Sequence, residues 1–195
     1  MKKLLITGFD PFGDGTVNPS WEAVKLLPDE IGGFQITKLQ IPTKFSVAAR
    51  TVLSAARTLQ PDVILSVGQA GGRDSVTPEV IAINLREASI ADNAGVLAQN
   101  EPVVAGAPAA YFSTVPVRQM AAAVRQAGIA CKLSYSAGAF VCNDTLYTLL
   151  HHYAGTDVQV GFIHVPFLPE QAGNGVPSMP LETITEALKI AIEAM

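Results

Sequence analysis

Charged side chains are scarce in this sequence. Lysine and arginine number 13 and aspartate and glutamate 17, so 15% of the 195 residues are charged and the formal net charge is −4. Soluble domains usually carry about 25% charged residues, and the shortage suggests a surface that other subunits partly cover. No run of basic residues occurs, which argues against a phosphate-neutralising patch and therefore against a nucleic-acid partner.

Long apolar runs are also absent. No stretch reaches the roughly 18 uninterrupted apolar residues of a membrane span. The positive start, Met1 to Lys3, is followed by only four further residues before Gly8, which is too short for a signal peptide. Two cysteines, Cys131 and Cys142, are too few for a disulfide scaffold. We therefore expect a cytoplasmic protein with reduced thiols and no membrane contact.

Apolar residues, by contrast, are plentiful. They make up 49% of the chain, which excludes a disordered protein. A chain of this length buries about 70% of its unfolded surface, so its stability requires neither a disulfide nor a metal. Because no repeat or linker divides the sequence, we expect residues 1–195 to form a single domain.

Short β-rich runs alternate with helical patterns along the chain, which is typical of an α/β fold. We expect a three-layer sandwich whose mixed, mostly parallel, twisted central sheet is flanked by helices. The expected strands cover 3–8, 34–41, 63–67, 80–85, 130–135 and 158–165. The expected helices run from the Asn18-Pro19 cap to Pro28 and over 45–59, 117–127, 143–153 and 181–195. Residues 86–114 show no strong period, and so long an excursion indicates a functional segment or an interface.

Several common site motifs do not match. The glycines of 8–15 lack the Lys-Ser/Thr of a phosphate loop, and those of 68–72 lack the spacing of a dinucleotide site. No Gly-x-Ser-x-Gly nucleophile elbow occurs. His151 and His152 are adjacent on an expected helix and do not share a face, so they are poor metal ligands. We expect neither a metal nor a cofactor.

The two cysteines stand in different local settings. Cys131 lies in an expected strand, where a cysteine is usually a small buried hydrophobe. Cys142 follows a Ser-Ala-Gly turn at the start of an expected helix. Unpaired backbone N–H groups there would lower the pKa of the thiol and could hold an oxyanion. An inert core thiol remains the alternative for Cys142.

A base and an orienting carboxylate can also be nominated. His164 ends an apolar run, and in open α/β sheets ligands gather at the carboxyl ends of strands. A satisfied core histidine is an equally common alternative. A Cys–His pair needs a third group to orient the imidazole. Glu79 is the most conspicuous carboxylate on a buried element, with Asp74 and Asp144 as rivals. The residues alone therefore permit, among other functions, a Cys/His hydrolase.

Longer motifs strengthen this interpretation. The sequence contains, in order, GFDPFG at 8–13, NPSW at 18–21, VTPE at 76–79, AINL at 82–85, DNAG at 92–95, SAGAFVCN at 136–143 and GFIHVP at 161–166. Together they resemble the pyrrolidone-carboxylate peptidases, the pyroglutamyl peptidase I family of cysteine peptidases, from residue 1 to the C-terminal helix.

The resemblance implies a function and a site. It implies removal of an N-terminal pyroglutamyl (5-oxoprolyl) residue from peptides through a thioacyl-enzyme intermediate, without a cofactor, by a homo-oligomer that is often a tetramer. The positions that fall on the family's catalytic triad are Glu79, Cys142 and His164. Those that fall on its pyroglutamate pocket are Phe9, Phe12, Gln69, Ile90, Phe140 and Val141.

One position departs from the family pattern. The family commonly has Ala-Arg-Ile-Pro-Asp-Asn where this chain has Ala-Ser-Ile-Ala-Asp-Asn at 88–93, so Ser89 replaces an arginine. Two interpretations follow: the site lacks that charge, or Arg86 replaces it from three residues earlier. The first leaves open a catalytically impaired homologue that only binds a lactam or peptide. An enzyme of similar fold acting on a nucleoside or another amide is a further alternative.

Overall fold

A six-stranded sheet runs through the centre of the molecule. The computed structural model describes residues 1–195, and its strand order is β2-β3-β1-β4-β8-β5. The four inner strands are parallel, whereas β2 and β5 pair antiparallel at the two edges. The strands are β1 (Lys2–Phe9), β2 (Glu30–Ile31), β3 (Phe34–Ile41), β4 (Val63–Gln69), β5 (Thr77–Pro78) and β8 (Gln159–Val165). The expected mixed, mostly parallel sheet is thus confirmed.

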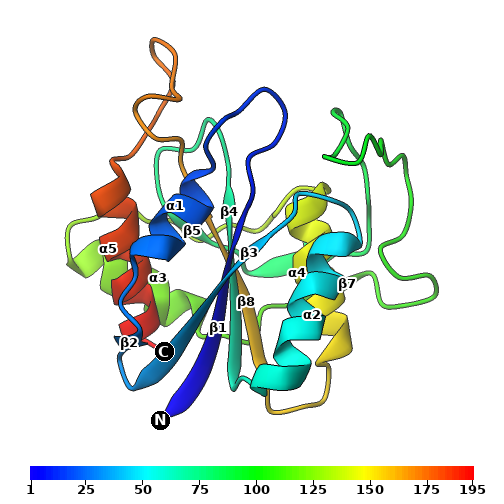
Figure 1. Cartoon of the computed structure of the whole chain (residues 1–195), viewed down its shortest axis with the longest axis horizontal. Helices are drawn as coiled ribbons and strands as arrows, with labels where there is room; N and C mark the ends of the chain where they lie inside the picture. The colour runs from blue at the N-terminus through cyan, green and yellow to red at the C-terminus, as the bar shows by residue number, and fades with distance from the viewer.

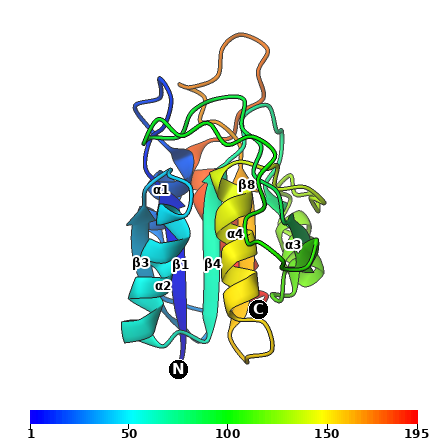
Figure 2. The ribbon, with the colours of Figure 1, turned by 90° about the vertical axis from the view of Figure 1, so that its right-hand side faces the viewer.

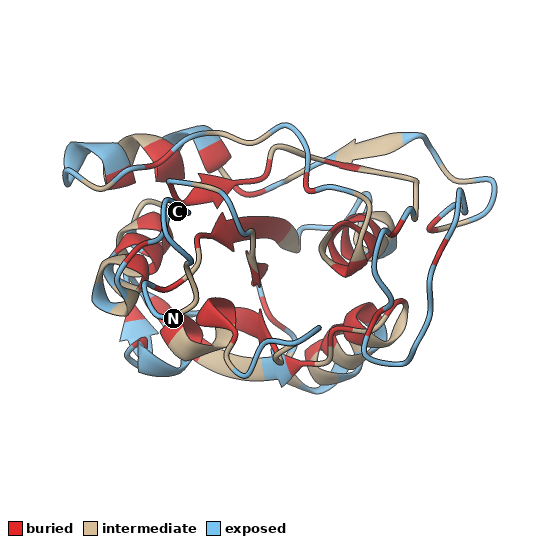
Figure 3. Cartoon of the chain, turned by 90° about the horizontal axis from the view of Figure 1, so that it is seen from above, coloured by how far each residue is buried: buried red, intermediate tan, exposed pale blue.

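Helices cover both faces of the sheet (Figure 1). On one face lie α1 (Pro19–Leu26), α3 (Val117–Gln126) and α5 (Leu181–Glu193), and on the other lie α2 (Val47–Leu59) and α4 (Val141–His152). Figure 2 shows α2 and α4 side by side in front of the strands. Each face has its own apolar core, of 27 and 19 buried residues, which is why the inner strands are apolar on both sides. Figure 3, seen from above, shows buried residues in red along the strands and on the sides of the helices that face them.

Local sequence explains where the first helix begins. The Asn18 side chain accepts a hydrogen bond from the Ser20 N–H at 3.1 Å, and Pro19 occupies the first helical position. Gly8 lies beneath this helix, since a Cβ there would come within 2.6 Å of the Trp21 backbone. The close packing of β1 against α1 therefore requires glycine at position 8.

The expected strand 130–135 is wrong as a continuous element. The segment is reduced to two isolated parallel bridges, Val76 with Cys131 and Glu79 with Ser134. Between them, Pro78 has no N–H to continue the ladder. Cys131 is therefore buried beside a broken edge rather than inside a strand.

The expected strand 80–85 is shorter than predicted and lies outside the main sheet. Residues Ile81–Ile83 form β6, which pairs antiparallel with β7 (Ala110–Phe112) in a separate two-stranded sheet. Most of the excursion between them has no helix or strand. The long loops gather at the end of the sheet where the parallel strands finish (Figures 1 and 2). No helix combines the length and apolar character needed to cross a membrane.

Candidate active site

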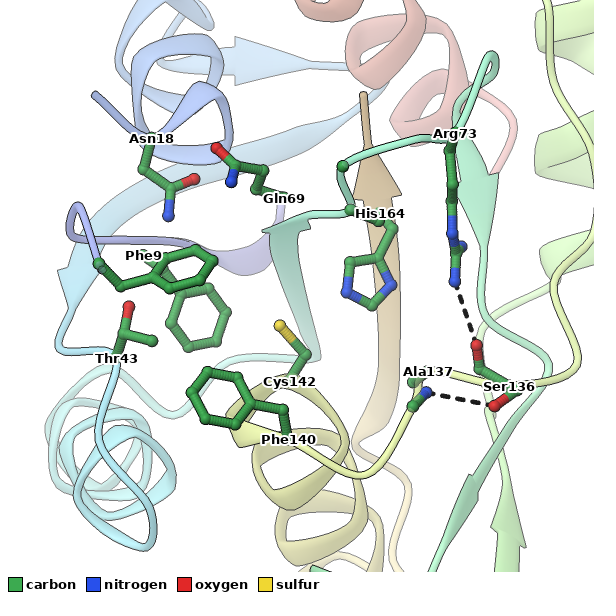
Figure 4. Close-up of a pocket in the computed structure, with 14 residues that line it drawn as sticks. Phe9, Asn18, Thr43, Gln69, Arg73, Ser136, Ala137, Phe140, Cys142 and His164 are labelled. Carbon is green, nitrogen blue, oxygen red and sulfur yellow. Dashed lines mark hydrogen bonds between the residues drawn. The ribbon is translucent and has the colours of Figure 1, made fainter. Parts of the chain in front are cut away.

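A cavity of about 350 Å³ opens at the carboxyl ends of the central strands (Figure 4). Its lining combines aromatic, amide and titratable side chains from segments distant in sequence. The lining residues are Phe9, Phe12, Asn18, Thr43, Gln69, Ala70, Gly71, Arg73, Ser136, Ala137, Gly138, Phe140, Cys142 and His164. Six of the nine predicted site residues thus line this cavity, and Glu79 lies directly behind His164.

Cys142 lies in the first turn of α4, and its sulfur points into the cavity beside His164 (Figure 4). Gly68 makes this approach possible. It is the register partner of His164 in the neighbouring strand, and a Cβ on Gly68 would lie only 2.9 Å from the Cys142 Sγ. The thiol thus rests over a glycine directly next to the histidine.

Glu79 holds the imidazole from behind. Its Oε1 lies 2.7 Å from the His164 Nδ1, and both side chains are buried. The Glu79 N–H donates to the Phe162 carbonyl oxygen at 2.9 Å, and Thr77 is the register partner of His164. Edge strand β5 therefore brings the carboxylate beside the imidazole, leaving Nε2 for the cavity.

The rival carboxylates do not reach the imidazole. Asp74 lies at the surface in an ion pair with Lys132. Asp144 is buried, but its Oδ1 lies 2.6 Å from the Arg86 Nε and its Oδ2 accepts from the Ser46 N–H. Glu79 is the carboxylate that contacts His164.

Arg73 is a site residue that the sequence analysis missed. Its Nη1 donates to the Glu79 Oε1 at 2.8 Å and to the Thr77 hydroxyl, and its Nη2 donates to the Ser136 carbonyl oxygen. Its position just after the glycine-rich break that ends β4 was the available signal, since that break lies at the carboxyl end of a central strand.

The replacement of the family arginine by Arg86 is not supported. Arg86 is engaged by Asp144 and donates to the Ser46 hydroxyl at 2.8 Å, and it does not line the cavity. Ser89 is exposed and also lies outside the lining. Arg73 is the cation that lines this cavity.

Burial dominates the ionisation of the site. Burial, together with the Glu79 charge, raises the pKa of Cys142 to about 12, although Arg73 opposes this. The expectation of a lowered thiol pKa at the helix start is therefore wrong, because burial and the Glu79 charge raise that pKa. Burial also lowers the pKa of His164 despite the Glu79 carboxylate. Burial raises the pKa of Glu79, but His164 and Arg73 more than reverse this and hold that pKa below its ordinary value.

Aromatic rings form the other side of the cavity. Phe12 and Phe140 lie with ring centroids 6.1 Å apart, and Phe45 supports Phe140 edge-on at 5.2 Å. Phe9 completes the apolar wall, and the Gln69 amide lies above it (Figure 4). Such a slot suits a flat ring that carries a polar edge.

Two predicted pocket residues lie elsewhere. The Val141 side chain is fully buried in the core on the α2–α4 face, because the first turn of α4 directs it inward. Ile90 is 48% exposed and lines a neighbouring hollow that shares Phe12 and Gln69 with the cavity. The structure adds Asn18 and Thr43 to the lining; the helix-cap pattern identified Asn18 only as a structural residue.

Known proteins resemble this chain over nearly its whole length. A sequence model of the pyroglutamyl peptidase family matches residues 2–195. The pyrrolidone-carboxylate peptidase of Levilactobacillus brevis is 50% identical in an alignment of 197 positions that covers 99% of this chain and 97% of that protein. Pyrrolidone-carboxylate peptidase 2 of Photorhabdus laumondii is 47% identical, with coverage of 98% and 90%.

The likeness extends to solved structures. Pyroglutamyl peptidase I of Bacillus amyloliquefaciens matches with a TM-score of 0.96 at 45% identity, covering 100% of this chain and 96% of that one. A mutant pyrrolidone carboxyl peptidase of Pyrococcus furiosus matches with a TM-score of 0.93 at 40% identity, with coverage of 98% and 97%. Since sequence and fold agree along the whole chain, this protein belongs to the pyroglutamyl peptidase family of cysteine peptidases.

Proposed function

We propose that the chain removes an N-terminal pyroglutamyl residue from peptides, with Cys142 as nucleophile, His164 as general acid and base, and Glu79 as the orienting carboxylate. The observation that carries this proposal is the position of the Cys142 sulfur, beside a Glu79-bound imidazole and at the edge of an aromatic slot. A nucleophile, a base and an orienting group in this relation are the requirements of acyl transfer.

In the first step the Cys142 Sγ attacks the pyroglutamyl carbonyl carbon while its proton passes to the His164 Nε2. A bond forms between sulfur and carbon, and the carbonyl oxygen becomes an oxyanion. The N–H groups of the first turn of α4 lack partners within the helix and can donate to that oxygen. Glu79 stabilises the imidazolium that results.

In the second step the imidazolium gives its proton to the departing amine as the carbon–nitrogen bond breaks. A thioester remains on Cys142. His164 then takes a proton from water, the hydroxide attacks the thioester, and pyroglutamate leaves as the thiol regains its proton. Each proton that His164 accepts is therefore returned within the cycle.

The ionisation of the site favours proton transfer during attack over a preformed ion pair. With a Cys142 pKa of about 12 and a lowered His164 pKa, both groups are neutral at rest near pH 7. Charge then develops on the sulfur and imidazole only as substrate reacts. The Arg73 guanidinium favours the thiolate and opposes the imidazolium.

The aromatic slot supports a lactam as the group that is recognised. Pyroglutamate is a flat ring with no free amine, so an anionic anchor of the kind used by ordinary aminopeptidases is unnecessary. Phe9, Phe12 and Phe140 offer apolar contact, and Gln69 offers an amide to the ring's polar edge.

Hydrolysis of a fluorogenic pyroglutamyl amide tests the proposal. Cys142→Ser and Cys142→Ala should abolish turnover, and Cys131→Ser is the matched control, because Cys131 lies buried outside the cavity and should leave most activity. Iodoacetamide should label Cys142 first. Activity that survives the Cys142 substitutions would refute the proposal, and lactam binding without hydrolysis by the wild type would favour the impaired homologue.

We further propose that residues 1–195 act as one catalytic domain, in the cytoplasm, as a homo-oligomer. The two cores on opposite faces of one sheet support a single unit. Exposed apolar residues, among them Leu97 and Phe112, support burial against another copy. Analytical ultracentrifugation tests the assembly; a monomer at all concentrations would contradict it.

A further inference from the structure

The strongest unassigned feature near the site is a chain of hydrogen bonds that ends on Gln69. Gln171 belongs to the loop that follows β8. Its Oε1 accepts from the Leu168 N–H at 2.9 Å, and its Nε2 donates to the Val17 carbonyl oxygen at 3.0 Å. The same Nε2 donates to the Gln69 Oε1 at 3.0 Å. Gln171 thus connects two backbone groups to a cavity residue.

The polarity of this chain is fixed at its start. A backbone N–H can only donate and a carbonyl oxygen can only accept, so Leu168 and Val17 leave Gln171 one favourable amide orientation. That orientation directs an N–H donor of Gln171 at Gln69, so Gln69 must accept the hydrogen bond with its side-chain oxygen. The Gln69 Nε2 is left without a partner in the chain, and Figure 4 shows it turned toward the cavity above Phe9.

We infer that Gln171 is a positioning residue that makes the cavity present a hydrogen-bond donor through Gln69, and so selects rings that carry a carbonyl oxygen. The inference rests on the proposed function and adds the basis of its ring specificity. A pyroglutamyl ring has a lactam oxygen to accept this bond, whereas a prolyl ring of similar size has a methylene there. A site built to hydrogen-bond its ligand discriminates strongly against an analogue that lacks the partner group.

Two substitutions at one position separate polarity from packing. Gln171→Glu keeps size and shape but offers only acceptors, so Gln69 turns its Nε2 toward the carboxylate and its oxygen toward the cavity. Gln171→Met fills the space and imposes no orientation. Gln171→Glu also sets an oxygen against the Val17 carbonyl oxygen, so a merely structural role predicts harm that is the same with and without the Gln69 amide. An orienting role predicts that Glu is the more harmful change only while the Gln69 amide is present.

Binding is measured with 2-pyrrolidone, as the concentration that half-protects Cys142 from iodoacetamide, beside KM and kcat for a pyroglutamyl amide. In Gln171→Glu the half-protecting concentration and KM should rise about tenfold or more, and in Gln171→Met about threefold or less. Because the lost bond is made in the ground state as well, kcat should change less than KM.

A control removes the amide that Gln171 orients. In a Gln69→Met background, Gln171→Glu and Gln171→Met should bind 2-pyrrolidone equally, which also exposes any effect of the added charge alone. Equal or weaker harm from Glu in the wild-type background, or harm that persists without the Gln69 amide, would overturn the inference. Binding of 2-pyrrolidone without hydrolysis by the wild type would refute only the proposed function, and no binding at all would overturn both.

Discussion

Glu79 uses one carboxylate oxygen for two donors. Its Oε1 accepts from both His164 and Arg73, while its Oε2 is buried without a partner. The carboxylate that we propose stabilises the imidazolium is therefore partly neutralised by the guanidinium. Arg73 should affect the pKa of the His164 imidazole both through its contact with Glu79 and through its own charge.

Arg73→Gln should move the acid limb of kcat/KM to higher pH. Loss of the positive charge raises the pKa of His164, and His164 must be neutral to accept the thiol proton. We expect kcat/KM near pH 7 to fall about tenfold or more. Arg73→Lys retains the charge and should keep the limb near its wild-type position. A loss of activity with an unshifted limb would mean that Arg73 only supports the fold.

At this scale, the sequence predicted which titratable residues come together better than it predicted which residues line the cavity. Cys142, His164 and Glu79 stand in long local motifs, and the structure places all three at or directly behind one cavity. Arg73 was missed because its contacts to Glu79 and Ser136 depend on how distant segments meet. The Val141 side chain lies in the core rather than in the lining, because consecutive residues on a helix point about 100° apart.

At the scale of elements, the close packing of α4 against β4 positions Cys142, the proposed nucleophile. Gly68→Ala should lower kcat about a hundredfold or more, because the added methyl group meets the Cys142 Sγ at 2.9 Å and the Phe162 ring at 2.8 Å. The readouts are kcat and the rate of Cys142 alkylation. The matched control is Gly72→Ala in the loop after β4, where no atom lies within 4 Å of the added methyl group but φ is positive, so its cost should be confined to stability. Normal kcat in Gly68→Ala would show that the thiol does not need this position.

The start of α4 is also tied to two distant segments through Asp144. Arg86→Ala should reduce the free energy of unfolding by about 3–5 kcal/mol, because it leaves a buried carboxylate without its cation. The double variant Arg86→Met with Asp144→Leu removes both charges and should be markedly more stable than Arg86→Ala. Urea unfolding of the three proteins tests this. Equal stability of Arg86→Ala and wild type would contradict it.

The predicted elements succeeded where one run of sequence decides the structure. The β-rich run at 34–41 became β3, the run at 158–165 contains all of β8, and the Asn18 cap began α1. The strand at 130–135 failed because its ladder depends on a partner 55 residues away, where Pro78 lacks the required N–H. Pairing of this kind cannot be read from either segment alone.

At the scale of the whole molecule, acid should destabilise the fold. The pKa of His164 is lowered below its ordinary 6.5, so the unfolded state binds a proton below that pH which the folded state does not. Glu79, whose pKa is also lowered, acts in the same direction below its ordinary 4.5. Through these two groups the free energy of unfolding should decrease as pH falls from 7, by about 1.4 kcal/mol for each unit of pKa difference fully expressed. Asp144, whose pKa is raised by burial, opposes them where it titrates.

Urea unfolding at a series of pH values measures this dependence. His164→Asn removes the histidine titration. In that variant the free energy of unfolding should change little with pH from about 6.5 down to about 4.5, the ordinary pKa of Glu79. A wild-type protein whose stability is constant or rises on acidification would contradict the assignment of a neutral buried imidazole.

The strand order β2-β3-β1-β4-β8-β5 also determines the stage of folding at which the active site can form. During synthesis, β1, β3 and β4 leave the ribosome long before β8, whose 159–165 segment is the last strand of the chain. Until then β4 offers an unpaired edge to any extended chain nearby, and the glycine beneath Cys142 has no histidine beside it. The pairing of β8 with β4 and β5 therefore completes the sheet and brings the proposed catalytic groups together in one event. In a refolding experiment, the onset of peptidase activity should coincide with the pairing of β8.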